Sequence, residues 1–339
     1  MKPKAFAALA AITLVMLIVA VATYVSQNRV SPVRVSGEAL FPGLAGKADR
    51  IAKIVITQGN TTLTLARDKE SWSLENRGGY PAKTETVRAL LIGLAEAELV
   101  EAKTSSKERY SVLELEEPRD KDAKSRLVQL LDDKGNAIAE VVVGKKRSDA
   151  FGSSRGGAYV RRPGDAQSWL ANADINAPMG ARDWVQPSII DIPSAKIASV
   201  DIAIVGEEPL KIVRDAGDAS KHTLAAMPNG KKLKDNYAID GIVRAAGSIE
   251  LEDVRKAASS QSQDASTVLL EADGGLKVTL RLRKEGDDYW LSAEASGADG
   301  EAKKTAEDIM RRAQGWQFKV STSKAQSILK RRADLFESS

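Results

Sequence analysis

The sequence predicts an α+β protein in which an N-terminal transmembrane helix precedes two tandem, duplicated modules, each a β-meander followed by a helix. An uncharged apolar run lies near the N-terminus, short alternating segments then give way to helical periodicity, and the same order of elements recurs in the second half. Hydrophobic residues make up 43% and charged residues 28% of the 339 residues, which is typical of folded proteins. The length after the apolar run, roughly 300 residues, suffices for two cores.

The apolar run covers residues 5–25, which contain no charged side chain. At about 1.5 Å per residue, this run nearly matches a hydrocarbon core of ~30 Å. Lys2 and Lys4 precede it, whereas Arg29 and Arg34 follow it, so the positive-inside rule only modestly favours a cytoplasmic N-terminus. We therefore expect a single-pass protein of a bacterial inner membrane, in contact with lipid through this helix and with most of the chain in the periplasm.

A cleaved signal peptide is the alternative, because Ala20-Val21-Ala22 could serve as a peptidase site. The run is longer than the 7–15 residues usual for a signal core, which favours a retained anchor. The sequence contains no cysteine, so it offers neither a lipidated cysteine nor a disulfide.

Residues 48–182 form the predicted first module. Apolar and polar residues alternate from Ile51 to Leu74, which predicts short, half-buried strands separated by turns. Thr84 is then the expected N-cap of a helix that continues to about Glu98. Further expected elements are two strands within Arg126–Val143, a third at Ala158–Arg161 and a short helix at Gln167–Ala173.

The predicted second module, residues 194–337, repeats this order. We expect strands at Ile197–Ile204 and Leu210–Arg214, a helix at Asn236–Ile249 and alternating strands within Thr267–Glu294. A short textual match supports duplication, because AQSWLANADI begins at Ala166 and AQSILKRRADL begins at Ala325. The full expected division is an anchor (1–28), a linker (29–47), the first module (48–182), a connector (183–193) and the second module (194–337).

Candidate catalytic motifs lack the context that their chemistry requires. The string from Gly152 to Gly156 matches the G-x-S-x-G pattern of a nucleophile elbow, but a strand rather than a helix is expected after it. His222 is the only histidine and lies in a polar stretch. With one histidine and no cysteine, a catalytic zinc site would have to rely on carboxylates. Asp132-Asp133 and Asp287-Asp288 are better explained as turn residues.

Nucleotide and nucleic-acid sites are not indicated either. Gly43–Lys47 and Gly144-Lys145 lack the spacing of a phosphate-binding loop. The 50 basic and 46 acidic residues are interspersed, whereas nucleic-acid binders usually concentrate basic residues on one face. The basic clusters are scattered along the sequence, at Arg161-Arg162, Lys231-Lys232, Arg311-Arg312 and Lys330-Arg331-Arg332. We therefore assign no catalytic, cofactor or metal residue.

The connector carries the most informative aromatic residue. Trp184 follows Asp183 where the two modules would join, and a rigid apolar ring there could pack between them. We name Trp184, Asp183, Tyr80 and Arg161 as candidate contacts between the modules or with a partner.

Several of these segments also carry a resemblance to a known family. They are the Ile51–Trp72 meander, Gly79-Tyr80-Pro81-Ala82, Val143-Gly144-Lys145, Ala158-Tyr159-Val160-Arg161, and Asp183-Trp184 before Ile189–Ile192. With the N-terminal run, they resemble the bacterial domain of unknown function 4340 family, membrane-anchored periplasmic proteins often encoded beside the permease and ATPase of gliding-motility-type ABC transporters. The resemblance implies a compartment and a multi-pass membrane partner, but no catalytic residue.

The expected function is therefore that of a periplasmic accessory or scaffolding subunit of such a transporter, which binds other subunits or a cargo and is not an enzyme. A stand-alone envelope scaffold or adaptor is the alternative, and an envelope hydrolase that uses carboxylates is a weaker one.

Overall fold

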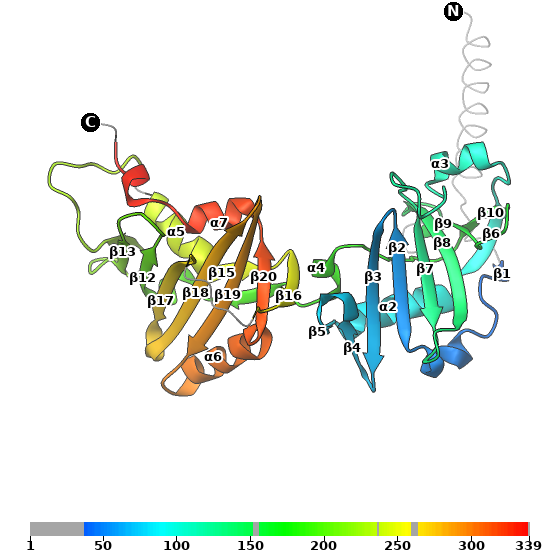
Figure 1. Ribbon diagram of the computed structural model, residues 1–339, viewed down its shortest axis with the longest axis horizontal. Helices are drawn as coiled ribbons and strands as arrows, with labels where there is room; N and C mark the ends of the chain where they lie inside the picture. The colour runs from blue at the N-terminus through cyan, green and yellow to red at the C-terminus, as the bar shows by residue number, and fades with distance from the viewer. Residues whose placement is uncertain (1–36, 152–155, 236, 259–263, 338–339) are drawn as a thin grey trace, which may run out of the picture.

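The computed structural model describes residues 37–151, 156–235, 237–258 and 264–337. Figure 1 shows two lobes side by side, each built on a large sheet and joined by a narrow connection that contains α4 (Ala181–Trp184). Within the described ranges, no helix combines the length and the apolar character needed to cross a bilayer. The helix expected at residues 5–25 lies outside the described residues.

The first lobe is built on a ten-stranded antiparallel sheet with the order β1-β6-β10-β9-β8-β7-β2-β3-β4-β5. Helix α2 (Thr84–Ala95) covers one face and buries Val87, Leu90 and Leu94 in the same core as Ile54 and Ile56 of β2. The strands are β1 (Glu38–Ala39), β2 (Lys53–Gln58), β3 (Thr61–Asp68), β4 (Ser71–Leu74), β5 (Tyr80–Pro81), β6 (Glu98–Ala102), β7 (Arg126–Leu131), β8 (Ala137–Arg147), β9 (Gly157–Arg161) and β10 (Ser168–Ala171).

A smaller group of apolar residues covers the opposite face of this sheet. The short helix α3 (Tyr110–Leu113) forms a separate apolar cluster in which Tyr110 and Leu115 pack with Val142, Tyr159 and Leu170. Successive strand residues point to opposite faces, so Val142 belongs to this cluster while Val141 and Val143 face the core under α2. The 3₁₀ helices of this lobe are η1 (Ala45–Arg50), η2 (Glu75–Arg77) and η3 (Lys107–Arg109).

The second lobe is built on an eight-stranded antiparallel sheet with the order β14-β13-β12-β17-β18-β19-β20-β16. Helix α6 (Gly300–Ala313) packs against β18 and β19, and α5 (Ala238–Gly247) packs against α7 (Thr322–Ile328). A two-stranded sheet joins β11 (Ser188–Asp191) to β15 (Ser248–Glu250). The other strands are β12 (Ile197–Ala203), β13 (Leu210–Arg214), β14 (His222–Leu224), β16 (Asp253–Lys256), β17 (Ser266–Ala272), β18 (Leu276–Glu285), β19 (Asp288–Ser296) and β20 (Trp316–Val320), and the 3₁₀ helices are η4 (Ser194–Lys196), η5 (Asp273–Gly275) and η6 (Arg332–Leu335).

The predicted α+β class with duplicated meander-plus-helix modules is wrong. The described chain is mostly antiparallel β-sheet, in sheets of ten, eight and two strands, and the helices only cover their faces. In the first lobe β2, β3 and β4 lie beside the run of β7, β8, β9 and β10, and in the second lobe β12, β13 and β14 lie beside the run of β17, β18, β19 and β20. The lobes nevertheless differ, because α6 separates β19 from β20 whereas only a short turn separates β9 from β10.

The textual match that suggested duplication adopts two different structures. Ala166-Gln167-Ser168 leads into β10, although a helix was expected at Gln167–Ala173, whereas Ala325-Gln326-Ser327 lies inside α7. Pairing of β10 with both β6 and β9 fixes the first string as a strand. The second is helical because the Ser321 hydroxyl accepts a hydrogen bond from the Lys324 amide at 3.1 Å and caps α7.

Candidate functional site

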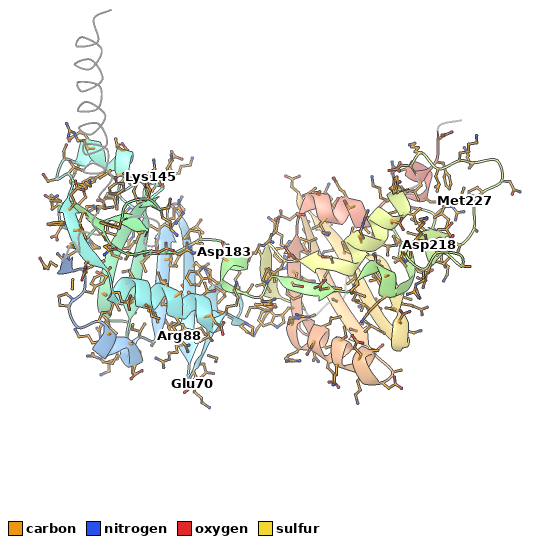
Figure 2. All side chains as sticks on the ribbon, turned by 180° about the vertical axis from the view of Figure 1, so that it is seen from behind. Glu70, Arg88, Lys145, Asp183, Asp218 and Met227 are labelled. Carbon is orange, nitrogen blue, oxygen red and sulfur yellow. The ribbon has the colours of Figure 1, made fainter. Side chains whose placement is uncertain are left out.

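An open groove runs along the outer side of α2 in the first lobe. It has a volume of about 480 Å³, and α2, η1 and the β3–β4 hairpin form its walls. Figure 2 shows Arg88 on α2, with Glu70 at the tip of that hairpin. Its lining is mainly apolar, from Leu44, Ala45, Ala48, Ile51, Trp72, Leu91, Ile92 and Ala95, and its polar residues are Asp49, Arg67, Glu70, Thr84 and Arg88. We call this feature the α2 groove.

Helical geometry explains which side chains of α2 reach the groove. Val87, Leu90 and Leu94 lie on one face and are buried against the sheet. Residues one position further along the chain are rotated by about 100°, so Arg88 and Leu91 project towards the groove. Ile92 is 48% exposed and extends the apolar surface of α2 beyond its buried stripe.

The two arginines of the α2 groove have different surroundings. Arg67 Nε donates to Lys69 O at 2.8 Å, and Arg67 Nη1 lies 3.4 Å from Ala48 O and Asp49 O, so this side chain holds η1 against β3. The Arg88 guanidinium forms no hydrogen bond or ion pair with any residue in the described part of the chain. Arg88 is therefore free to bind a carboxylate beside the exposed Ile92.

A second hollow of about 820 Å³ adjoins the α2 groove and shares Asp49, Ile51 and Arg67 with it. The β7–β8 turn borders it, and Asp132 Oδ1 accepts hydrogen bonds from the Lys134 and Asn136 amides at 2.9 and 2.8 Å. Hydrogen bonds from Asn136 lower the pKa of the Asp132 carboxyl below its ordinary value, and the charge of Arg50 adds to this shift. The turn prediction for Asp132-Asp133 is thus confirmed.

The structure also gives the surroundings of the other motifs that the sequence analysis considered. The His222 side chain is buried although it lies in a polar stretch of the sequence, and its Nε2 is 3.0 Å from Ile197 O and its Nδ1 3.4 Å from Asp240 Oδ1. Asp288 pairs with Glu285 at the β18–β19 hairpin, as its turn prediction requires. Residues 152–155 of the G-x-S-x-G string lie outside the described residues. No group of three or more His, Cys, Asp or Glu residues in the described ranges is arranged to hold a metal ion.

The lobes meet at a narrow contact that we call the waist. Tyr80 is 4% exposed and packs edge to face against Trp316 and Phe318 of β20, with ring centroids 5.0 and 5.9 Å apart. Burial raises the pKa of the Tyr80 hydroxyl above its ordinary value. Arg77 Nε lies 2.6 Å from Asp253 Oδ1, so an ion pair joins η2 to β16 beside the rings.

Trp184 closes the waist from the connector. It is fully buried, and its Nε1 donates to Pro178 O at 2.9 Å. Trp184 O accepts a hydrogen bond of 2.6 Å from the Lys83 amide, immediately before α2. Asp183 is exposed on α4 between the lobes. Of the candidate contact residues, the structure thus brings Tyr80 and Trp184 to the waist and leaves Asp183 beside it.

Arg161 lies away from the waist, on the α3 side of the first sheet. Its side chain is 4% exposed, pairs with Glu117 at 2.9 Å and lies over the Tyr110 ring at 4.8 Å. Arg161 Nη1 also donates to Asp165 O at 3.3 Å. This arginine fastens the loop after α3 to β9, and its side-chain contacts with described residues lie within the first lobe.

An arginine next to the waist forms an ionic cluster in the second lobe. Arg255 of β16 lies over the Trp290 ring at 3.8 Å and donates to Glu285 from both Nη atoms, at 2.9 and 2.6 Å. Hydrogen bonds from Arg255 and Arg283 lower the pKa of Glu285 to about 2. Glu285 therefore remains ionised well below the ordinary range of a glutamate.

We expect that the free energy of unfolding of the Glu285→Gln variant will fall less steeply at acidic pH than that of the wild type. A lowered folded-state pKa stabilises the protein above the ordinary glutamate value, and this contribution is lost as pH falls from about 4.5 towards 2. With the side chain 29% exposed, the contribution should be about 1–2 kcal/mol after solvent screening. Urea unfolding at several pH values measures this contribution. If the variant lost stability between pH 4.5 and 2 as steeply as the wild type, the role assigned to Glu285 would be contradicted.

Sequence reasoning named Tyr80 and Trp184 but missed the residues that meet them at the waist and those that line the α2 groove. Arg77, Asp253 and Trp316 come from segments far apart in the sequence, so only the folded chain brings them together. The sequence contains a weak signal for the exposed position of Ile92. This residue follows Leu90 and Leu91, so the apolar stripe of α2 is wider than the face that packs against the sheet.

Comparisons with known proteins identify a family but no individual relative. The family model described as domain of unknown function (DUF4340) matches residues 72–272, which is more than half of the chain. The match begins at Trp72 in the β3–β4 hairpin, spans the waist connector and ends with β17. Comparison with curated proteins and comparison with solved structures give no match. The chain therefore belongs to the family defined by the domain of unknown function DUF4340.

Proposed function

We propose that this chain is a membrane-anchored periplasmic accessory or scaffolding subunit of a gliding-type ABC transporter complex, and that it acts by binding a protein partner or cargo. The α2 groove carries the proposal, because it places the Arg88 guanidinium, which has no partner among the described residues, beside the exposed Ile92 on one helix. An apolar concave surface with a few polar groups is the usual form of a binding site.

The chemistry of the α2 groove favours a protein segment that carries both apolar and carboxylate side chains. Leu44, Leu91 and Ile92 offer an apolar floor, and Arg88 offers a charge-assisted hydrogen bond at its edge. Arginine is one of the three residue types, with tryptophan and tyrosine, that most often dominate the binding energy of an interface.

The waist supports a scaffolding role. Tyr80, Trp184 and Phe318 belong to one continuous core that runs through both lobes. A partner held at the α2 groove would thus be kept at a defined position relative to the second lobe.

Charge reversal in the α2 groove tests this proposal. We expect Arg88→Glu combined with Ile92→Asp to reduce the recovery of multi-pass membrane subunits with the affinity-tagged full chain from mild detergent by about tenfold, or ~1.4 kcal/mol. Both side chains are exposed, so the fold should be retained, which circular dichroism can verify. Glu85→Gln is the matched control, because Glu85 is exposed on the same helix and does not line the groove.

Two results would contradict the proposal. If the wild-type chain purifies without membrane subunits at near-stoichiometric yield, the stand-alone scaffold is the better description. If the double variant retains its partners, binding takes place elsewhere on the surface.

A further inference from the structure

Helix α2 lies between two hollows of the first lobe, and Ile92 lines both of them. One is the α2 groove, and the other, on the opposite flank of the helix, has a volume of about 800 Å³. Ala89, Gly93 and Glu96 line this other hollow from α2. Residues three or four positions apart lie on the same face of a helix, so Ala89, Ile92 and Glu96 form one row along its border.

The charged residues that line this hollow are all acids, namely Glu96, Glu98 and Asp174. Lys146 Nζ lies 3.0 Å from Asp174 Oδ1 and compensates that carboxylate. Glu96 and Glu98 form no ion pair with any residue in the described part of the chain. The charge of both glutamates is therefore uncompensated, and we call this feature the acidic hollow.

The α2 groove does not cancel this charge, because its own acids and bases balance each other. Its charged residues are Asp49, Arg67, Glu70 and Arg88. The uncompensated charge of the two hollows together is therefore negative, and it lies on the flank of Ile92 that faces away from the groove.

An unsatisfied acceptor lies in the wall of the acidic hollow. Asn172 lines the hollow, and its Oδ1 atom is inaccessible to solvent and accepts no hydrogen bond from any described residue. Buried polar atoms normally have a partner. Ionised carboxylates can only accept hydrogen bonds, so the two free glutamates add further acceptors. A ligand that fits this hollow therefore supplies hydrogen-bond donors and positive charge.

We infer that the partner segment bound at the α2 groove crosses Ile92 and places a lysine or arginine side chain in the acidic hollow. An apolar side chain of the partner covers Ile92, and the neighbouring cation meets Glu96 one helical turn further on. A metal ion is a poorer match, because no group of three or more acidic residues in the described ranges is arranged to hold one. The inference rests on the proposed function and deepens it, since it assigns a basic residue to the partner.

Two short fluorescent peptides test this charge preference. Both carry a pair of leucines, which lysines flank in one peptide and glutamates in the other. Fluorescence anisotropy measures their binding to the full chain in a nonionic detergent. We expect the lysine peptide to bind about tenfold more tightly, and this preference to weaken as the salt concentration rises. Equal binding, or a preference for the glutamate peptide, overturns the inference.

Charge reversal in the acidic hollow locates the binding site. Glu96→Lys combined with Glu98→Lys should remove the preference for the lysine peptide, whereas Asp120→Lys combined with Asp122→Lys should retain it. The control pair is exposed, changes the net charge equally and lines neither hollow. A lysine at the end of α2 also interacts favourably with the helix dipole, so the fold should be retained, which circular dichroism can verify. If the two double variants behaved alike, the peptide would be bound by general charge and the inference would be wrong.

Two other occupants of the acidic hollow would give different results. Calcium chloride that displaces the lysine peptide at an ionic strength where sodium chloride does not would identify a metal site. Arg155, which precedes the lining residue Gly156 and lies outside the described residues, is a cation of the chain itself. If Arg155→Ala made the lysine peptide bind about tenfold more tightly, this arginine would be the natural occupant. Either result overturns the inference.

Failure of the proposed function gives a separate result. If no membrane subunit is recovered with the wild-type chain, yet the lysine peptide binds at Glu96 and Glu98, the transporter role is wrong and the basic preference of the hollow stands. If subunits are recovered and Arg88→Glu with Ile92→Asp releases them, the proposed function holds. The inference alone is then wrong if Glu96→Lys with Glu98→Lys leaves both the recovery and the peptide preference unchanged.

Discussion

Replacing Trp184 by alanine is expected to lower the free energy of unfolding by about 3–5 kcal/mol. The indole is fully buried at the waist, so its removal leaves a cavity in the core that both lobes share. The change also leaves Pro178 O without its hydrogen-bond donor. Urea unfolding of the full chain, followed by far-ultraviolet circular dichroism, measures the loss.

Trp184→Phe separates packing from hydrogen bonding. Phenylalanine fills most of the volume but cannot donate to Pro178 O, so a smaller loss of about 1–2 kcal/mol is expected. Spin labels at Glu70→Cys and Glu207→Cys should report a broader distribution of distances between the lobes in the alanine variant. An alanine variant within 1 kcal/mol of the wild type, with an unchanged distribution, would show that Trp184 does not hold the waist.

Gly144→Ala is the second substitution with a large expected effect. A β-carbon at Gly144 would overlap Leu113 O and Glu114 O, because β8 passes directly beneath the end of α3. Backbone cannot move aside as a flexible side chain can, so we expect a loss of about 2–4 kcal/mol and release of α3 from Tyr159 and Leu170. Urea unfolding measures the loss, and faster proteolysis between β6 and β7 would report the release of α3.

Gly241→Ala provides the matched control. Gly241 lies inside α5, and nothing lies within 4 Å of the β-carbon position. Alanine should there raise stability by about 0.5–1 kcal/mol, since glycine is costly in a helix interior. If both glycine variants behaved alike, the close approach at Gly144 would not be the cause of its effect.

Local periodicity predicted those elements that local contacts determine. The alternation from Ile51 to Leu74 corresponds to β2, β3 and β4, and the helix expected from Thr84 is α2. The predicted ends of the helix were less accurate. Lys83 rather than Thr84 is the N-cap, without a side-chain cap bond, and α2 ends at Ala95, because Glu98 already begins β6 and pairs with Ala39.

Elements whose conformation depends on pairing with segments far away in the sequence could not be predicted from local periodicity. Trp169 lies in a strand because it pairs with Val160 and Ala102 on its two sides, whereas the sequence around it suits a short helix equally well. The same limit applies to the sites. Arg88 and Arg67 line one groove from a helix and a strand, and no sequence spacing relates them.

The order of the strands also determines when the waist can form during synthesis. The waist residue Asp253 lies on β16, whose pairing partner in the sheet is β20, and the rings that enclose Tyr80 are also on β20. Such long sequence separations slow folding, because the chain loses the entropy of closing a long loop before the contact can stabilise it. A chain that emerges N-terminus first will therefore hold the Tyr80 ring exposed until β20 has emerged. The lobes can thus be joined through Tyr80 only after β20 has been synthesised.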